Sequence, residues 1–308
     1  METRPFGNTG LQTSVLGFGA APIGVLETPQ EQVTQLLNEL LDLGVNTIDT
    51  AAGYRGSEEA IGKAIAHRRD EFVLISKCGQ AFEGLAGDAW SAQVIEQTID
   101  RALTRLQTDR IDVMLLHTCD LETLQRGEAL EALVQARQAG KVRFSGYSGD
   151  NDAIRYAIAH DQVSAIETSI NVCDQVNIHD ALPLAADEGV GVIAKRPIAN
   201  AAWKQLGDQP GFYSEYAKTY TERLAEMNVS LNDLGIPGSA ETAWPELALR
   251  FTLTHQPVHT AIIGTTNVDH LRHNIQSVAK GPLSDDVMEA LYTAFRSAQA
   301  EEGWPGLT

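Results

Sequence analysis

The chain alternates short runs rich in β-branched residues with longer amphipathic segments, and this alternation constrains its fold more than any other feature. Helices are predicted between the strands at residues 29–44, 57–68, 91–106 and 121–140. The pattern predicts eight strands, at residues 15–20, 46–50, 72–77, 111–117, 142–148, 163–168, 189–195 and 259–264. Parallel neighbouring strands need a crossover helix, so the order strand then helix predicts a parallel sheet. Eight strands favour an α/β fold of the closed (β/α)8 TIM-barrel type.

An open dinucleotide-binding sheet is the main competing fold. That fold requires three glycines, spaced G-x-G-x-x-G, directly after its first strand. Here Gly17 and Gly19 occupy the first two positions, but Pro22 stands in the third. The motif is therefore broken, which again favours the barrel.

Three segments lie outside the repeat. Residues 1–14, with a turn at Asn8, predict a β-hairpin ahead of the first barrel strand. Residues 199–241 form a long insertion after strand 7, with a helix predicted at 213–227, and connections of this length are usually functional lids. Residues 284–308 predict a C-terminal helix and tail. We expect residues 1–308 to form a single domain.

The charge balance bears on partners. Lys and Arg number 23 against 41 Asp and Glu, a net charge of −18, which argues against a nucleic acid or an anionic membrane as partner. A small phosphorylated ligand needs only a local positive site. No signal-peptide pattern or 18-residue apolar stretch occurs. Three scattered cysteines, Cys78, Cys119 and Cys173, fit a reducing cytoplasm.

Four reactive side chains follow the predicted strand ends. Asp49, Lys77 and His117 end strands 2, 3 and 4, and Tyr54 lies five residues after Asp49. Active sites of (β/α)8 barrels lie at the carboxyl ends of the strands. A phenol, with an ordinary pKa of about 10, donates a proton efficiently at neutral pH only if a cation such as Lys77 lowers that pKa. Asp49 can hold the ammonium, and a neutral His117 can donate a hydrogen bond to a substrate oxygen. The set predicts a site that protonates a carbonyl oxygen, although each residue alone has an ordinary structural explanation.

At these residues the sequence resembles the aldo-keto reductase family, and the resemblance covers nearly the whole chain. It runs through RPFGNTGLQTSVLGFG, GVNTIDTAAGYRGSEEAIGKAI, LISK, LQTDRIDVMLLH, ELALRF and IIGTTNVDHLRHNI. The resemblance implies that Tyr54 is the general acid, that Lys77 and Asp49 adjust its acidity, and that His117 orients the substrate. It also implies NADPH bound across the barrel mouth and the reduction of an aldehyde or ketone, or the reverse oxidation of an alcohol.

The resemblance implies a cofactor wall that departs from the family pattern. Where the family has Ser-Asn, Gln and an aromatic-Ser-Pro-Leu run, this chain has Ser148-Gly149, Glu167 and Lys195-Arg196-Pro197-Ile198. We hypothesise that Glu167 and Lys195, on neighbouring strands, form an ion pair; the alternative is that Lys195 points toward the lid. Arg196 stands where the family contacts the pyrophosphate, or it is a solvated loop residue. The implied cofactor-binding residues are Gly19, Ala20, Ala21, Ser148, Gly149, Glu167, Lys195, Arg196, Pro197, Ile198, Ile263, Gly264, Thr265, Thr266, His270, His273 and Asn274.

The predicted adenosine end lacks a usual feature. Gly264 and Thr265 stand where many members have Lys and Ser, and His270 stands where many have Arg. His273 replaces a common Glu, whereas Asn274 matches the family. A Lys or Arg clamp on a 2′-phosphate is therefore absent. NADP(H) is the cofactor expected from the family, and NAD(H) becomes a realistic second choice.

Other interpretations stay open. The same fold could serve as a non-catalytic nucleotide-sensing subunit. A metal-dependent hydrolase using His117, Asp49 and a thiol is disfavoured, because no H-x-H pair closes strand 1 and Lys77 would repel a cation. The cysteines are either a thiol-sensitive or metal-capable site, or small residues in strand-end loops. The residues leave the substrate, the direction of reaction and the oligomeric state open.

Overall fold

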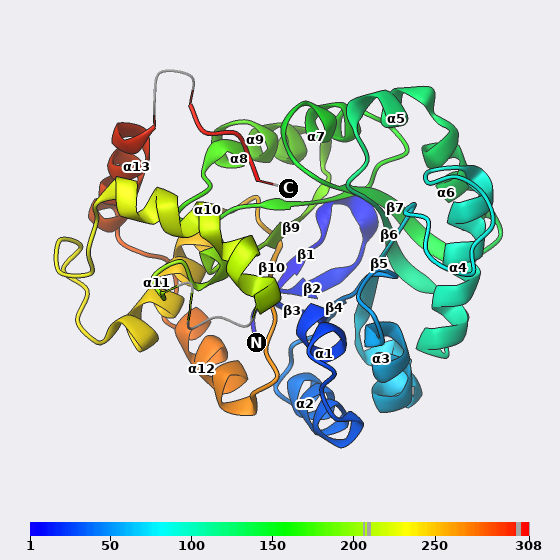
Figure 1. Cartoon of the computed structure of the whole chain (residues 1–308), viewed down its shortest axis with the longest axis horizontal. Coiled ribbons are helices and arrows are strands. Elements are labelled where there is room, and N and C mark those ends of the chain that lie inside the picture. Colours follow the sequence, from blue (N-terminus) through cyan, green and yellow to red (C-terminus); the bar gives the residue numbers. More distant parts are fainter. Residues whose placement is uncertain (206, 208–210, 300–302, 308) are drawn as a thin grey trace.

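A computed structural model describes residues 1–205, 207, 211–299 and 303–307. Eight parallel strands close into a barrel in the order β10-β3-β4-β5-β6-β7-β8-β9 (Figure 1). They are β3 (Leu16–Gly19), β4 (Thr47–Asp49), β5 (Val73–Cys78), β6 (Ile111–His117), β7 (Val142–Ser148), β8 (Ala165–Ser169), β9 (Gly191–Lys195) and β10 (Thr260–Ile263). The predicted (β/α)8 barrel is confirmed, and all eight strands lie within the predicted ranges to one or two residues.

Helices surround the barrel because each carries one apolar stripe that packs on the strands. In α2 the buried residues Val33, Leu36, Leu37 and Leu40 repeat at helical spacing. The surrounding helices are α2 (Gln30–Asp42), α3 (Ser57–Ile65), α4 (Ala92–Leu106), α6 (Glu128–Gln138), α7 (Asn151–Ile158), α9 (Ala181–Glu188), α11 (Ala240–Thr254) and α12 (Val268–Ala279). Shorter helices occur in the loops: α1 (Ala21–Val25), α5 (Leu121–Arg126) and α8 (Val176–His179).

The single helix predicted over 121–140 was wrong. The chain forms two helices there, α5 and α6, which meet at Gly127. Gly127 has a φ of 78°, a left-handed conformation that glycine adopts without steric cost and that ends α5.

The predicted N-terminal hairpin is confirmed and closes one end of the barrel. Strands β1 (Thr3–Pro5) and β2 (Gln12–Ser14) pair antiparallel. Between them, the fully buried Phe6 joins the interior barrel residues Val113 and Ile193 in one apolar cluster. A Cβ on Gly191, the first residue of β9, would lie 2.6 Å from the Phe6 ring, so the hairpin fits because this position has no side chain.

The insertion after strand β9 and the C-terminal segment lie at the opposite end. The insertion begins with η3 (Ala199–Ala201) and contains α10 (Gly211–Met227), which extends the helix predicted at 213–227 by two residues. Helix α10 packs against η3 and against α13 (Asp285–Ala298), as Figure 1 shows. The tail returns to β8, where the Leu307 carbonyl accepts a hydrogen bond from the Ser169 hydroxyl (2.6 Å).

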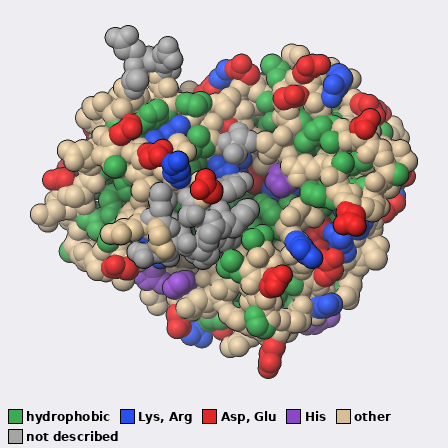
Figure 2. All heavy atoms as spheres, viewed as in Figure 1, with side chains coloured by type: hydrophobic (Ala, Val, Ile, Leu, Met, Phe, Trp, Pro, Cys, Tyr) green, Lys and Arg blue, Asp and Glu red, His purple; other side chains and the backbone are tan. Residues whose placement is uncertain are grey.

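Two further features concern the molecule's surface. Acidic side chains are spread over the face drawn in Figure 2, with basic ones between them, in keeping with the net charge of −18. None of the described helices combines the length and apolar character that crossing a membrane requires.

Candidate active site

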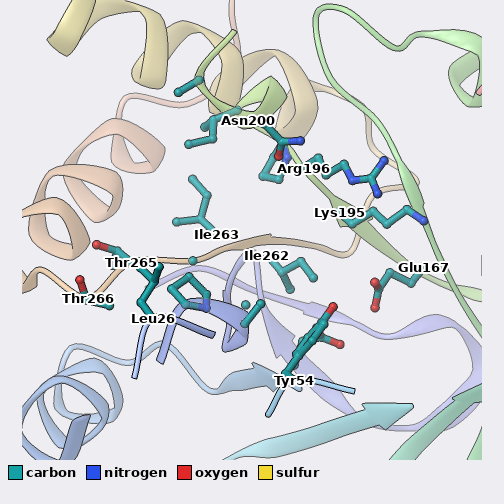
Figure 3. Close-up of a pocket in the computed structure, with 18 of the residues that line it drawn as sticks. Leu26, Tyr54, Glu167, Lys195, Arg196, Asn200, Ile262, Ile263, Thr265 and Thr266 are labelled. Atoms are coloured by element: carbon teal, nitrogen blue, oxygen red, sulfur yellow. The ribbon is translucent and has the colours of Figure 1, made fainter. Parts of the chain in front are cut away.

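A cavity of about 490 Å³ lies at the carboxyl ends of the barrel strands (Figure 3). Its wall is formed by residues from seven of the barrel strands or from the loops that follow them: β3, β4, β6, β7, β8, β9 and β10. The lining residues are Gly19, Ala21, Pro22, Leu26, Asp49, Tyr54, His117, Thr118, Ser148, Glu167, Lys195, Arg196, Pro197, Ile198, Asn200, Ala201, Lys204, Ile262, Ile263, Gly264, Thr265, Thr266 and His270.

A buried ion pair lies at the base of the cavity. The Lys77 ammonium is 2.6 Å from both carboxylate oxygens of Asp49, and it donates to the Thr50 carbonyl at 3.1 Å. Lys77 and Asp49 are each about 1% exposed. Burial alone would lower the pKa of Lys77, but the nearby carboxyl groups of Asp49 and Glu167 raise it above its ordinary value. Lys77 is therefore a permanent cation at this point.

Tyr54 and His117 face the cavity beside that cation. The Lys77 ammonium lies 5.4 Å from the centre of the Tyr54 ring, and the Tyr54 and His117 rings are 6.0 Å apart and nearly perpendicular. Burial, with Lys77 nearby, lowers the pKa of His117 to about 3. The imidazole is therefore neutral at physiological pH and can donate a hydrogen bond from one nitrogen.

The loop after β4 positions Tyr54. Its main-chain N–H donates to the Ala51 carbonyl (3.0 Å), and its own carbonyl accepts from the N–H of Ser57 (2.9 Å), the first residue of α3. The Ser57 hydroxyl in turn donates to the Ala20 carbonyl at 3.0 Å. Tyr54 is thus tied through Ser57 to the segment after β3, which also borders the cavity. The four predicted catalytic residues are brought together, three of them lining the cavity and Lys77 directly beneath it. Their roles stay predictions.

Glu167 is a second carboxyl group at the base. It is about 2% exposed, and its Oε2 lies 3.2 Å from the Lys77 ammonium. Burial raises the pKa of Asp49, and the charge of Glu167 raises it further. Burial also acts to raise the pKa of Glu167, but Lys77 and Lys195 outweigh it, so this pKa lies below its ordinary value. Lys77 and Lys195 therefore favour the charged form of Glu167.

The hypothesis of a Glu167–Lys195 ion pair was wrong. Both residues are in the described part of the chain; Glu167 pairs with Lys77, and the Lys195 ammonium lies 3.2 Å from Asp150. The strand register explains this, because Glu167 lies beside Ile193 whereas Lys195 lies beside Ser169, one layer nearer the mouth. Asp150 is held in place by the Thr168 hydroxyl (2.6 Å).

Most of the predicted cofactor wall lines the cavity. Lining residues from that set are Gly19, Ala21, Ser148, Glu167, Lys195, Arg196, Pro197, Ile198, Ile263, Gly264, Thr265, Thr266 and His270. Four predicted residues, Ala20, Gly149, His273 and Asn274, do not line it. Ala20 is fully buried beneath the wall, its N–H donating to the Asp49 carbonyl (2.8 Å), and Gly149 is tied by its N–H to the Glu167 carbonyl (3.0 Å). His273 and Asn274 lie further along α12.

Sequence reasoning missed several lining residues and the role of Asp150. Pro22 lies on α1 and Leu26 directly follows that helix, whereas Asn200, Ala201 and Lys204 belong to the insertion after β9. Thr118 and Asp150 follow strands β6 and β7, and Ile262 lies within β10. Their positions can be assigned only when the pairing register of the strands is known. Nothing in the sequence indicates where the insertion packs on the barrel. The place of Lys204 in the cavity wall could therefore not be predicted.

The residues present fit a phosphate-bearing dinucleotide. Lys195, Arg196, Lys204 and His270 bring basic groups to the wall of an otherwise acidic protein. Gly264–Thr266 lead into α12, and the main-chain N–H groups at a helix start attract anions. The Arg196 guanidinium also donates to the Leu307 carbonyl of the tail at 3.0 Å. The cavity therefore combines basic groups, which suit phosphates, with the phenol of Tyr54.

The three cysteines are free thiols and buried. Burial raises the pKa of Cys119 to about 12 and raises those of Cys78 and Cys173 well above the ordinary value. Within the residues that the structure describes, no group of three or more His, Cys, Asp or Glu side chains is arranged to hold a metal ion. The buried thiols favour the interpretation of these cysteines as small packing residues.

Comparisons with known proteins agree with this arrangement. The model of the family described as Aldo/keto reductase family matches residues 15–294. An L-galactose dehydrogenase from Arabidopsis thaliana is 28% identical over 91% of this chain and 89% of its own length. The oxidoreductase YqkF of Bacillus subtilis (strain 168) is 28% identical over 94% of this chain and 95% of its own length. The holo form of the aldo-keto reductase AKR11C1 from Bacillus halodurans superposes with a TM-score of 0.79, at 28% identity, covering 96% of each chain.

Proposed function

The chain belongs to the aldo-keto reductase family, and from that premise we propose that it is an NADP(H)-dependent oxidoreductase that interconverts a carbonyl compound and its alcohol, with Tyr54 as the proton donor. The family in general carries out carbonyl reduction with nicotinamide cofactors. One observation supports placing this reaction in the cavity at the barrel mouth. A permanently charged Lys77, clamped by Asp49 at 2.6 Å, lies 5.4 Å from the Tyr54 ring and beneath a neutral His117.

Each residue has a distinct task in this proposal. When bound, the nicotinamide supplies the hydride that the carbonyl carbon receives. Tyr54 gives its phenolic proton to the carbonyl oxygen, and the Lys77 ammonium stabilises the phenolate that is left. Asp49 holds that ammonium in place. His117 donates a hydrogen bond to the same oxygen and orients it. In the reverse direction the alcohol oxygen returns its proton to Tyr54.

The cofactor and compartment are finer parts of the proposal. We infer that the phosphates lie along Lys195, Arg196 and the segment Gly264–Thr266, with His270 nearest to a 2′-phosphate. Because His270 replaces the usual Arg, NAD(H) is accepted as a second cofactor. The buried free cysteines support a reducing cytoplasm as the location. The name of the plant relative makes aldoses such as L-galactose a sensible part of any substrate panel.

A turnover assay tests the proposal. The protein is mixed with NADPH or NADH and a panel of aldehydes and ketones, and with NADP+ or NAD+ and the matching alcohols, while the nicotinamide absorbance is followed. We expect turnover by the wild type, and for Tyr54→Phe a loss of about 10²- to 10⁴-fold, since this is the usual contribution of a positioned general acid.

The control is Tyr156→Phe, which changes a half-buried tyrosine on α7 outside the cavity. It should turn over like the wild type, and Tyr54→Phe should still bind cofactor. Full activity of Tyr54→Phe would refute the role of Tyr54.

A further inference from the structure

Glu167 brings a carboxyl group into the wall of the cavity and shares its nearest cation, Lys77, with Asp49. Its Oε2 is buried and lies 3.2 Å from the Lys77 ammonium, and its carboxyl group also meets the Asp49 carboxyl group. Its Oε1 receives only a long hydrogen bond from the Ser148 hydroxyl (3.4 Å). A buried carboxylate that shares its cation with a second carboxyl group is costly, and positive charge placed in the adjoining cavity would lower that cost.

The cations around Glu167 are already shared. Lys77 makes its two shortest contacts, at 2.6 Å, with Asp49 rather than with Glu167. Lys195 is paired with Asp150 at 3.2 Å. The ammonium groups of Lys77 and Lys195 therefore neutralise three carboxyl groups between them. Neither ammonium pairs with Glu167 alone.

Glu167 also lies close to where the reaction is proposed to take place. Its Oε2 is 3.2 Å from the same ammonium that lies 5.4 Å from the centre of the Tyr54 ring. In Figure 3 the carboxyl end of Glu167 points toward the hydroxyl end of Tyr54. If a nicotinamide ring bound where it could exchange hydride with a carbon whose oxygen meets Tyr54, Glu167 would belong to the wall of the same cavity.

We propose that Glu167 is a specificity-determining residue that strengthens binding of the oxidised, positively charged nicotinamide relative to the reduced, neutral one, and so favours alcohol oxidation among the bound species. This inference rests on the proposed function. In that direction the alcohol carbon gives a hydride to the oxidised ring and the hydroxyl proton goes to Tyr54, leaving a carbonyl and a neutral ring. Glu167 does not change the equilibrium between alcohol and carbonyl compound in solution. It shifts only the equilibrium between the protein-bound reactants and products.

Binding measurements without substrate test this. Calorimetric titrations with NADP+ and NADPH give two dissociation constants, and the readout is the ratio of the reduced to the oxidised value. We expect Glu167→Gln to lower this ratio about three- to tenfold, because a negative charge is removed from the wall of a partly shielded cavity. Lys195→Met removes a positive charge from the same wall, so it should move the ratio in the opposite direction.

Glu58→Gln is the matched control. Glu58 is an equally buried glutamate that is bonded to Ser76 (3.0 Å) and lies outside the cavity, so the ratio should stay at its wild-type value. An unchanged or increased ratio in Glu167→Gln would overturn the inference while the proposed function stands. Binding of neither form by the wild type would overturn both. If Glu167→Gln fails to fold, the Lys195→Met variant tests the inference instead. A ratio of the reduced to the oxidised dissociation constant that does not rise in Lys195→Met contradicts the inference.

Discussion

Burial determines the charge state of the reactive side chains at this barrel mouth. His117 is kept neutral because burial and the neighbouring Lys77 lower its pKa to about 3. Lys77 remains charged in spite of burial, because Asp49 and Glu167 compensate for it. A neutral hydrogen-bond donor and a fixed cation therefore lie beside one phenol, which is the combination that the proposed proton transfer to a carbonyl oxygen needs.

The burial of the three cysteines predicts how slowly their thiols react with an alkylating agent. Cys78, Cys119 and Cys173 are at most 3% exposed, and burial raises the pKa of each thiol. Because the thiolate is the reactive form, iodoacetamide at pH 7.5 should leave the native protein unmodified, whereas all three thiols react in guanidinium. Intact mass after a timed incubation measures this. Rapid single alkylation of the native protein, prevented by bound cofactor, would instead restore the thiol-sensitive interpretation.

Single residues were predictable where their positions follow from strand periodicity. Asp49, Lys77 and His117 end strands that are clear in the sequence, so their meeting at one rim follows from the barrel alone. The partner of Lys195 did not follow, because a one-layer difference in register separates Glu167 from Asp150. Pairings across a rim depend on such offsets, which a single sequence does not encode locally.

At the scale of elements, β9 and β10 are joined by a histidine side chain. The Nδ1 of His259 accepts a hydrogen bond from the main-chain N–H of Val192 at 2.9 Å. The same ring packs edge-on against Phe6 of the hairpin, with ring centres 5.5 Å apart. Burial, together with the charge of Arg4, lowers the pKa of His259 to about 4. A protonated ring could not accept this bond.

This arrangement predicts a pH-dependent stability. The pKa of His259 is about 4 in the folded protein and about 6.5 when unfolded, so its contribution is complete above pH 6.5 and is lost as the pH falls toward 4. Urea unfolding at pH 7.5 and pH 4.5 should show the wild type losing about 1–2 kcal/mol more than His259→Gln. The two proteins would lose equal stability if the ring did not titrate on unfolding.

Elements were predictable where their periodicity is strong. The strands and helix α2 follow directly from apolar spacing. The division at Gly127 was missed because the apolar pattern continues across it, and only the left-handed backbone there separates α5 from α6. The path of residues 199–241 was equally hidden, since its contacts with α13 involve partners distant in sequence.

At the scale of the whole molecule, we propose that residues 1–308 form a single domain. The main buried cluster includes Tyr220 of α10, Phe251 of α11 and Leu291 of α13 together with the barrel's outer face. Because these elements share one core, we expect a single thermal unfolding transition. A separate early transition for the C-terminal half would contradict it.

The net charge of −18 is compatible with an anionic cofactor because charge is distributed unevenly. Lys195, Arg196, Lys204 and His270 line the one cavity that also holds Tyr54. The sequence predicts the need for such a local basic region. It does not predict the contribution of Lys204, which depends on how the insertion folds.

Isotope transfer is the most direct test of the central claim, that this cavity moves a hydride between a nicotinamide and a carbon whose oxygen is protonated by Tyr54. NADPH deuterated on one or the other face of C4 is supplied with a carbonyl substrate, and the alcohol is analysed by mass spectrometry. We expect one deuterium per product molecule from one of the two labelled cofactors, and almost no product with Tyr54→Phe. An alcohol whose new carbon-bound hydrogen comes from solvent would contradict this mechanism.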